Sequence, residues 1–136
     1  MAEAVLRGAS HRDVEGVETR MLECLRAKVS DLLWAEALIL GTPENFGMLA
    51  GAMKDFFDRT FYPAAGRVEG LPYTAFVKGG NDGTGALRDM RRIVKGYPFR
   101  ECQPPIVCGG VLTTEVLEQC EDLGTRMALG LALGMY

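Results

Sequence analysis

The sequence predicts an α/β protein built on a doubly wound parallel sheet. Two observations carry this prediction. Short apolar runs of strand length alternate along the 136 residues with longer runs in which apolar side chains recur at helical spacing. The run at 37–40 is apolar throughout and ends in Gly41-Thr42-Pro43, as expected for a strand buried on both faces of a parallel sheet. We expect a single domain over residues 1–136, with right-handed crossovers placing helices on both faces of the sheet.

The first part of the chain contains three predicted elements before this buried strand. Residues 1–9 place their apolar side chains on one side of a helix. Residues 17–22 alternate apolar and polar side chains, which predicts a half-exposed strand at a sheet edge. Ser30 and Asp31 are expected to cap a short helix at 32–35, which leads into the buried strand.

The rest of the chain continues the alternation of helix and strand. Gly96 is expected to stop the third helix, and Thr113 or Thr114 to cap the last one. The predicted elements are a helix over 48–60, a strand over 73–77, a helix over 86–95, a strand over 106–108, and a final helix that buries Val116, Cys120, Leu123, Met127 and Leu131.

Composition and charge argue against several classes of protein. The net charge of −3 argues against nucleic acid as a partner, because there is no basic excess to neutralise phosphates. No apolar run reaches the roughly 18 residues of a transmembrane helix, so we expect no membrane segment, and the amino terminus predicts no secretory signal. The four cysteines form no C-x-x-C pair and there is one histidine. We therefore expect reduced thiols, no metal site and a cytoplasmic protein.

A polar loop follows the buried strand, at the edge where open α/β sheets place their ligands. It consists of Gly41, Thr42, Pro43, Glu44, Asn45, Phe46 and Gly47. Pro43 holds its φ fixed, and Gly47 lets the backbone approach a flat ligand. Glu44 and Asn45 bring hydrogen-bonding groups and Phe46 a ring face, so the loop suits a planar heteroaromatic ring with polar edges. The alternative is an ordinary connection in which Asn45 caps the next helix.

A second polar loop follows the predicted strand at 73–77. It consists of Lys78, Gly79, Gly80, Asn81, Asp82, Gly83, Thr84 and Gly85. Its glycines and asparagine tolerate positive φ, which is typical of a tight loop. Because both loops follow parallel strands that we expect to be neighbours, they should converge on one concave ligand site.

The segment 41–47, followed by GAMKDFFDR at 51–59, resembles the flavodoxin-like FMN-binding family. It is most similar to the NAD(P)H:quinone reductase and FMN reductase branch, and the loop at 78–85 ahead of an Ala-Leu-Arg helix fits the same branch. The resemblance runs from residue 1 to about 131. It implies a five-stranded sheet of order 2-1-3-4-5, with FMN at the switch point between the first and third strands.

The resemblance also implies which residues contact the flavin. The first loop would lie along the isoalloxazine ring, through Thr42, Pro43, Glu44, Asn45, Phe46 and Gly47. The second would close over the other side of the ring through Gly79, Gly80, Asn81, Asp82 and Gly83, of which 80–83 would contact the pyrimidine edge largely by backbone.

One part of the family pattern lies outside this sequence. The family's first strand and its Ser/Thr-rich phosphate loop precede a helix that reads like residues 1–9. That loop offers three or more charge-assisted hydrogen bonds of about 1.5–3 kcal/mol each. We therefore expect a sheet without its first strand. We also expect weak or absent FMN binding, since losing roughly 5 kcal/mol weakens affinity on the order of a thousandfold.

By resemblance, the expected function is that of an FMN-dependent oxidoreductase. It would take a hydride from NAD(P)H and pass electrons to a quinone or a similar small-molecule acceptor; the cofactor carries this chemistry, so we assign no catalytic residue. Two alternatives stay open. One is a flavodoxin-type electron carrier, a class usually much more acidic than −3. The other is a truncated non-catalytic module with weak or no FMN binding.

The aromatic residues Phe61 and Tyr62, followed by Pro63, lie beside the proposed flavin loop. Related quinone reductases bury such a surface between subunits, so the resemblance implies a homo-oligomer. A local packing cluster is the alternative interpretation of these residues.

Overall fold

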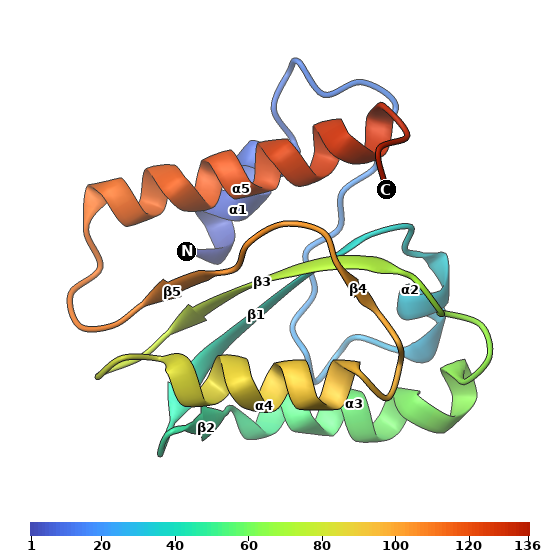
Figure 1. The fold of residues 1–136 in the computed structure, drawn as a ribbon. Helices are drawn as coiled ribbons and strands as arrows, with labels where there is room; N and C mark the ends of the chain where they lie inside the picture. The colour runs from blue at the N-terminus through green and yellow to red at the C-terminus, as the bar shows by residue number, and fades with distance from the viewer.

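The computed structural model describes residues 1–136, in five helices and five strands (Figure 1). The helices are α1 (Ala2–Ala9), α2 (Val29–Trp34), α3 (Gly51–Ala64), α4 (Thr84–Val94) and α5 (Thr114–Ala132). The strands are β1 (Leu38–Asn45), β2 (Met48–Leu49), β3 (Pro72–Lys78), β4 (Arg100–Glu101) and β5 (Ile106–Cys108).

The long strands form a parallel sheet. β1 pairs with β3 from Leu38↔Tyr73 to Pro43↔Lys78, and β3 pairs on its other side with β4 and then with β5. β2 is a short antiparallel return of β1. The predicted parallel arrangement of the strands near 37–40, 73–77 and 106–108 is therefore confirmed.

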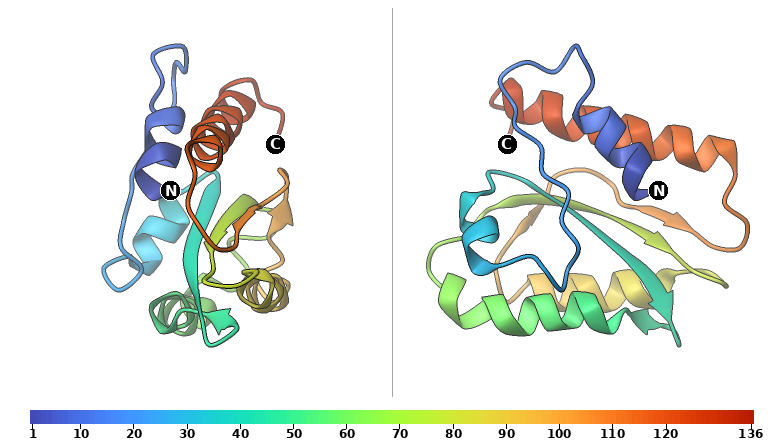
Figure 2. Two further views of the ribbon diagram at one scale, coloured as in Figure 1. Left: turned by 90° about the vertical axis from the view of Figure 1, so that its left-hand side faces the viewer. Right: turned by 180° about the vertical axis from the view of Figure 1, so that it is seen from behind.

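Helices cover both faces of the sheet, as predicted for a doubly wound fold. α3 and α4 lie side by side on one face, and α1 and α5 lie together on the other (Figure 2). α1 and α5 approach closely because glycines meet at their crossing: a Cβ at Gly8 would lie 1.8 Å from the carbonyl oxygen of Glu121. None of the five helices has the length and apolar character that a membrane span requires.

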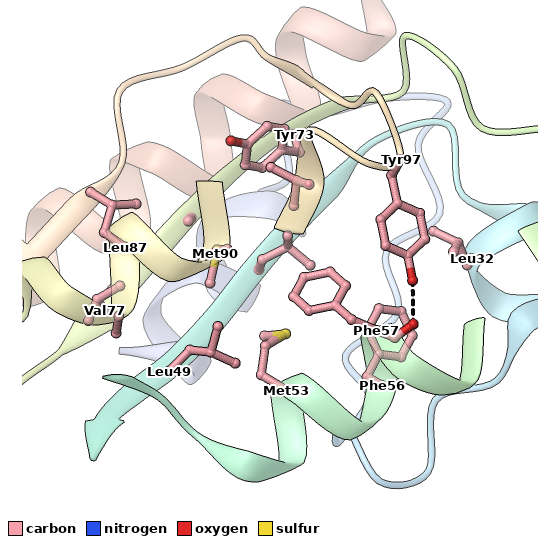
Figure 3. Close-up of a cluster of buried hydrophobic side chains, with 14 of the residues drawn as sticks. Leu32, Leu49, Met53, Phe56, Phe57, Tyr73, Val77, Leu87, Met90 and Tyr97 are labelled. Carbon is pink, nitrogen blue, oxygen red and sulfur yellow. Dashed lines mark hydrogen bonds between the residues drawn. The ribbon is translucent and has the colours of Figure 1, made fainter. Parts of the chain in front are cut away.

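The main hydrophobic core fills the space between the sheet and the layer of α3 and α4 (Figure 3). Phe57 and Met90 are among its fully buried side chains. Tyr97 inserts its ring beside Phe57, and its hydroxyl donates a 2.6 Å hydrogen bond to the Phe57 carbonyl. A smaller cluster around Val5 and Cys120 packs α1 and α5. Both clusters hold β1, β3 and β5 in place, and with them the loops at the carboxyl ends of these strands.

Residues 17–22 do not form the predicted edge strand. They run beside the sheet without joining it (Figure 2), and none of residues 15–22 makes a backbone–backbone hydrogen bond. The alternating pattern does describe the burial of part of the segment, because Val17 and Thr19 are half-buried while Glu18 is exposed. A strand also needs a neighbour that completes the ladder, and no strand pairs with this segment. The prediction is wrong for that reason.

The start of α2 also differs from the prediction. The helix begins at Val29 after Lys28, so Ser30 lies inside the first turn. Asp31 still satisfies this end of the helix, because its carboxylate accepts a 2.8 Å hydrogen bond from the backbone N–H of Lys28. At α5 the N-cap is Thr113, one of the two predicted residues, and its side chain accepts from the N–H of Val116.

Candidate functional site

The two polar loops predicted from the sequence lie at the carboxyl ends of adjacent parallel strands. Pro43 and Lys78 are register partners at the ends of β1 and β3, so the loops that follow them start side by side. The loops also touch: a Cβ at Gly85 would lie 2.0 Å from the carbonyl oxygen of Gly47. The structure thus brings both predicted segments together at one edge of the sheet.

The first loop is shaped as a hairpin. β1 continues to Asn45, and the chain turns through Phe46 and Gly47 into β2, with Asn45 paired to Met48. Both turn residues have positive φ, 53° at Phe46 and 72° at Gly47, as a two-residue hairpin turn of type I′ requires. The loop therefore presents a rigid turn at the edge of the sheet.

Phe46 is the unusual residue of this turn. It is the one non-glycine residue of the chain with positive φ, and its side chain is 99% exposed. A bulky residue in the left-handed region costs of order 1–3 kcal/mol, and such residues cluster at functional sites. Its ring packs on nothing in the protein, so a full aromatic face is open to a planar ligand.

Thr42 plays a structural part instead of facing outward. Its side chain is buried, its hydroxyl donates to the carbonyl of Pro43 at 2.9 Å, and it accepts from the backbone N–H of Ala50 at 3.1 Å. Ala50 is the N-cap of α3. Thr42 therefore fixes the hairpin against the start of α3, while Pro43 and Asn45 remain exposed beside it.

Glu44 points to the second loop. Its carboxylate accepts a 3.1 Å hydrogen bond from the backbone N–H of Ala86, in the first turn of α4. The residue before this helix is Gly83, which has no side chain to cap it. Glu44 supplies the missing cap from a distant part of the sequence and holds the two loops together.

The second loop combines a buried anchor with an exposed tip. Gly79 is buried and donates from its N–H to the carbonyl of Cys108 at 2.9 Å, while Gly83 is buried and left-handed, with φ 74°. Gly80, Asn81 and Asp82 are exposed. Asn81 thus offers its amide, and the backbone of 80–82 its polar groups, at the edge of the site.

Asp82 folds back on α4. Its carboxylate accepts from the backbone N–H of Thr84 at 2.9 Å and from the hydroxyl of Thr84 at 2.8 Å. These two bonds hold the pKa of Asp82 below its ordinary value, and the bond from the backbone N–H has the larger effect. Two carboxylates, those of Asp82 and Glu44, therefore occupy the amino end of α4. That helix end cannot also hold a phosphate group, which would meet like charge there.

A third loop belongs to this edge, which the sequence analysis missed. The ammonium of Lys78 donates to the carbonyl of Gly79 at 2.6 Å and to that of Gly110, after β5, at 2.5 Å. A Cβ at Gly109 would lie 2.0 Å from the carbonyl oxygen of Asn81. The available signals were the lysine at a strand end and the Gly109-Gly110 pair after the next strand. Lys78 thus joins the second loop to the third as Glu44 joins the first to the second.

The resulting surface suits binding more than acid–base chemistry. It offers the ring of Phe46, the amides of Asn45 and Asn81, and exposed backbone, but no histidine. No group of three or more metal-binding side chains lies together in the molecule. The part of FMN that these residues fit is the planar ring with its polar edges. They do not fit the phosphate, because the ammonium of Lys78 already donates to two carbonyls and the end of α4 carries two carboxylates.

The sequence is similar to a known family and to a flavodoxin. Residues 2–106 match the family described as NADPH-dependent FMN reductase. The chain is 32% identical over 149 aligned residues to a flavodoxin of Aquifex aeolicus, an alignment that covers 98% of this chain and 80% of that protein.

Solved structures share the fold. A flavodoxin from the domain Archaea superposes with a TM-score of 0.77 at 21% identity, covering 95% of this chain and 86% of that one. A mutant flavodoxin from Pseudomonas aeruginosa gives 0.74 at 21% identity, covering 96% and 91%. The rubredoxin:oxygen oxidoreductase of Desulfovibrio gigas gives 0.74 at 17% identity, where this chain corresponds to 34% of that larger protein. These structures have the flavodoxin-like fold in common with the present one.

Proposed function

The chain belongs to the NADPH-dependent FMN reductase family, a flavodoxin-like family of FMN-binding proteins, and on this premise we propose that it is an FMN-dependent oxidoreductase. It would pass electrons from NAD(P)H to a quinone or a similar small-molecule acceptor. The observation that supports the proposal is the exposed ring of Phe46 on a strained turn, beside a second loop whose exposed polar groups face the same edge of the sheet. We also propose a cytoplasmic setting, in keeping with four free thiols.

In this function the residues of the protein would bind the flavin and orient its ring. Phe46 would stack on the isoalloxazine ring, Asn45 and Asn81 would bond its polar edges, and Gly80 would let the backbone approach it. When bound, the flavin supplies the hydride and electron chemistry, so no side chain has to act as acid or base. Glu44 and Lys78 would keep the loops in register without touching the ring.

A direct assay tests this proposal. The protein is mixed with FMN, NADH or NADPH, and a soluble quinone, and loss of the nicotinamide absorbance is followed. Flavin binding is measured separately by quenching of flavin fluorescence. Phe46→Ala and Asn45→Ala should weaken flavin binding, whereas Tyr62→Ala, an exposed aromatic on α3, should not. If binding and quinone reduction are unchanged in both loop variants, this loop does not hold the ring.

A second candidate is a one-electron carrier, and the 32% identity to the Aquifex flavodoxin favours it. A carrier would bind flavin at the same loops yet consume no NAD(P)H without a separate reductase. Quinone-dependent NAD(P)H oxidation by the isolated protein therefore separates the two functions. A third candidate, a module that binds no flavin, rests on the two carboxylates at the start of α4. The fluorescence titration tests this third candidate, because such a module would not quench the flavin fluorescence.

We also propose that the protein is a homo-oligomer. The aromatic residues expected at a subunit contact divide into two groups in the structure. Phe61 packs edge-on against Tyr97, with ring centroids 5.2 Å apart, and so belongs to the local packing. Tyr62 is 84% exposed and is free to meet another subunit. Sedimentation of the wild type and of Tyr62→Ala tests this; a monomer at micromolar concentration in both would contradict it.

A further inference from the structure

The outer face of α4 carries a row of exposed cations. They recur at spacings of three and four residues, so they lie on one side of the helix. This α4 cation row consists of Arg88, Arg91, Arg92 and Lys95. The net charge of the whole chain is −3, so the row is a local concentration of positive charge on an otherwise acidic molecule.

Carboxylates of the protein pair with only half of this row. The guanidinium of Arg88 lies 3.1 Å from the carboxylate of Asp89, and that of Arg91 donates to both carboxylate oxygens of Glu101, at 2.9 and 2.6 Å. No ion pair of the molecule involves the other two side chains of the row. Two cations, those of Arg92 and Lys95, therefore remain open to the acidic groups of a partner.

A hollow lies at the carboxyl end of the row, between α4 and β4. Its volume is about 300 Å³. The residues that line it are Tyr73, Arg91, Val94, Lys95, Phe99 and Glu101. Sites for small molecules have volumes of about 300–1,000 Å³, so this hollow is at the lower end of that range. It suits one large side chain better than a cofactor.

The lining of the hollow is fixed by contacts within the protein. Tyr73 and Val94 are buried, and the ring of Phe99 packs against those of Tyr97 and Tyr73, with centroids 4.8 and 6.2 Å apart. The hydroxyl of Tyr73 donates to Glu101 at 3.0 Å, on the carboxylate that also accepts from Arg91. Because these side chains are already ordered, little conformational entropy is lost when a partner fills the hollow.

We propose that the hollow and the α4 cation row together dock an acidic segment of another protein. One aromatic or large aliphatic side chain of that segment would enter the hollow as an anchor. Asp or Glu residues on either side of the anchor would meet Arg92 and Lys95 at the rim. A buried anchor supplies most of the affinity of such contacts, and complementary charge at the rim supplies orientation and a faster encounter.

Charge and shape favour an acidic protein over other occupants. Nucleic acid is a poor match for a chain with a net charge of −3. A membrane surface would need an exposed apolar face, whereas the apolar residues Leu87 and Met90 of α4 are buried in the core. A second copy bound by two-fold symmetry at this surface would bring the cation row against itself.

The docking surface is separate from the candidate flavin site. Tyr73 lies near the start of β3, whereas the loops of the candidate site follow Lys78 at its end. At about 3.3 Å per residue, these two positions are roughly 17 Å apart along the strand. A docked segment would therefore leave the flavin loops open. The proposal goes beyond the proposed function, and its test needs no flavin.

An NMR titration of the 136-residue protein tests the proposal. The probe is a blocked five-residue peptide with phenylalanine at the centre and Asp or Glu at the other positions. Amides of residues 88–101 should shift and saturate, while those of the flavin loops at 44–47 and 80–82 should not. A peptide with serine at the centre should bind on the order of tenfold more weakly. Raising NaCl from about 25 to about 250 mM should also weaken binding, on the order of tenfold.

Matched double variants locate the charge effect. Arg92→Gln combined with Lys95→Gln should weaken binding of the phenylalanine peptide on the order of tenfold. The control combines Arg12→Gln with Arg26→Gln, which removes two exposed cations from the segment between α1 and α2. It should leave the affinity within about twofold, because these cations lie outside the docking surface. The amide spectra of the variants without peptide report whether the fold is intact.

Several results would overturn the proposal. They are no saturable shift in 88–101, equal affinity for the phenylalanine and serine peptides, and equal losses in the two double variants. A single-stranded oligonucleotide that shifts the same amides with equal or higher affinity would assign the cation row to nucleic acid instead. Sedimentation covers the remaining occupant. If the wild type is an oligomer that the Arg92→Gln and Lys95→Gln variant dissociates, the row is a contact between copies of this chain.

Discussion

The carboxylate of Glu44, near the end of β1, caps the first turn of α4 by accepting from the backbone N–H of Ala86 at 3.1 Å. The first N–H groups of a helix have no partner within it, and the preceding Gly83 cannot provide one. One side chain therefore serves both as helix cap and as the link between two loops of the candidate site. The position of the turn at Phe46 and Gly47 is coupled in this way to the stability of α4.

Replacing this carboxylate should destabilise the protein and loosen the site. For Glu44→Ala we expect a loss of about 1 kcal/mol in the free energy of unfolding, as for other lost helix caps. Glu44→Gln should recover part of it, because the amide oxygen can still accept. Urea denaturation measures both, with Glu36→Ala, an exposed glutamate, as the control. Equal stability of the Ala and Gln variants would contradict the capping role.

Phe46 should show a conflict between stability and binding. Phe46→Asn puts the preferred Asn-Gly pair into the type I′ turn, and we expect it to stabilise the protein by about 0.5–1 kcal/mol. The same change removes the exposed ring, so flavin affinity should fall by about tenfold. Thermal unfolding and a fluorescence titration give the two values. A variant that gains stability without losing affinity would separate the strained turn from the ring-binding role.

The parts of the fold that the sequence predicts best are those set by side-chain burial alone. The apolar run at 37–40 predicts β1, although Leu38 and Ile39 are only partly buried in the structure. The helical spacing behind it predicts α3, but the expected start at residue 48 is wrong, because Met48 and Leu49 form β2 and the helix begins at Gly51. The prediction of a strand at 17–22 is wrong for a related reason. Alternation reports which side chains face inward, whereas a strand also depends on a neighbour elsewhere in the chain.

The candidate site was predictable in position but not in detail. Parallel pairing of β1 with β3 follows from the alternation of elements, and it brings both loops to one edge. The sequence did not predict the hairpin, because Phe46 occupies a turn position at which Asn is the usual residue. The links made by Glu44 and Lys78 join residues far apart in sequence, and no local pattern reports such contacts.

Tyr73 should make the protein sensitive to alkaline pH. Burial, and then its hydrogen bond to Glu101, raise the pKa of Tyr73 from 10.0 to about 12. The fold therefore favours the neutral phenol: this stabilisation is complete below pH 10 and is lost as pH rises through the folded-state pKa of about 12. Tyr73→Phe should flatten the fall in unfolding free energy over that range. Tyr62→Phe, at an exposed tyrosine, should not, and a similar slope in both variants would exclude Tyr73 as the cause.

The buried hydroxyl of Tyr97 should matter for stability alone. It donates to the carbonyl of Phe57 at 2.6 Å and lies 2.8 Å from the hydroxyl of Thr60, in the core shown in Figure 3. Tyr97→Phe keeps the ring but leaves these buried oxygens with fewer partners, so we expect a loss of about 1–2 kcal/mol on denaturation. Flavin affinity should stay unchanged, because Tyr97 belongs to the core and not to the loops. A drop in affinity would show that the core and the site are coupled.

FMN and riboflavin should bind these 136 residues with similar, weak affinity. The two ligands share the isoalloxazine ring, which Phe46 and the exposed amides can hold, and differ in the phosphate. No cation in the three loops is free to meet that phosphate: Lys78 donates to two carbonyls, and the carboxylates of Glu44 and Asp82 occupy the start of α4. The two dissociation constants, from fluorescence quenching, should agree within a few fold, and FMN should be lost on gel filtration. A phosphate site with about 5 kcal/mol of hydrogen bonds would instead favour FMN on the order of a thousandfold. A preference of that size, or a yellow protein that keeps stoichiometric FMN, would show that this chain holds the phosphate by itself.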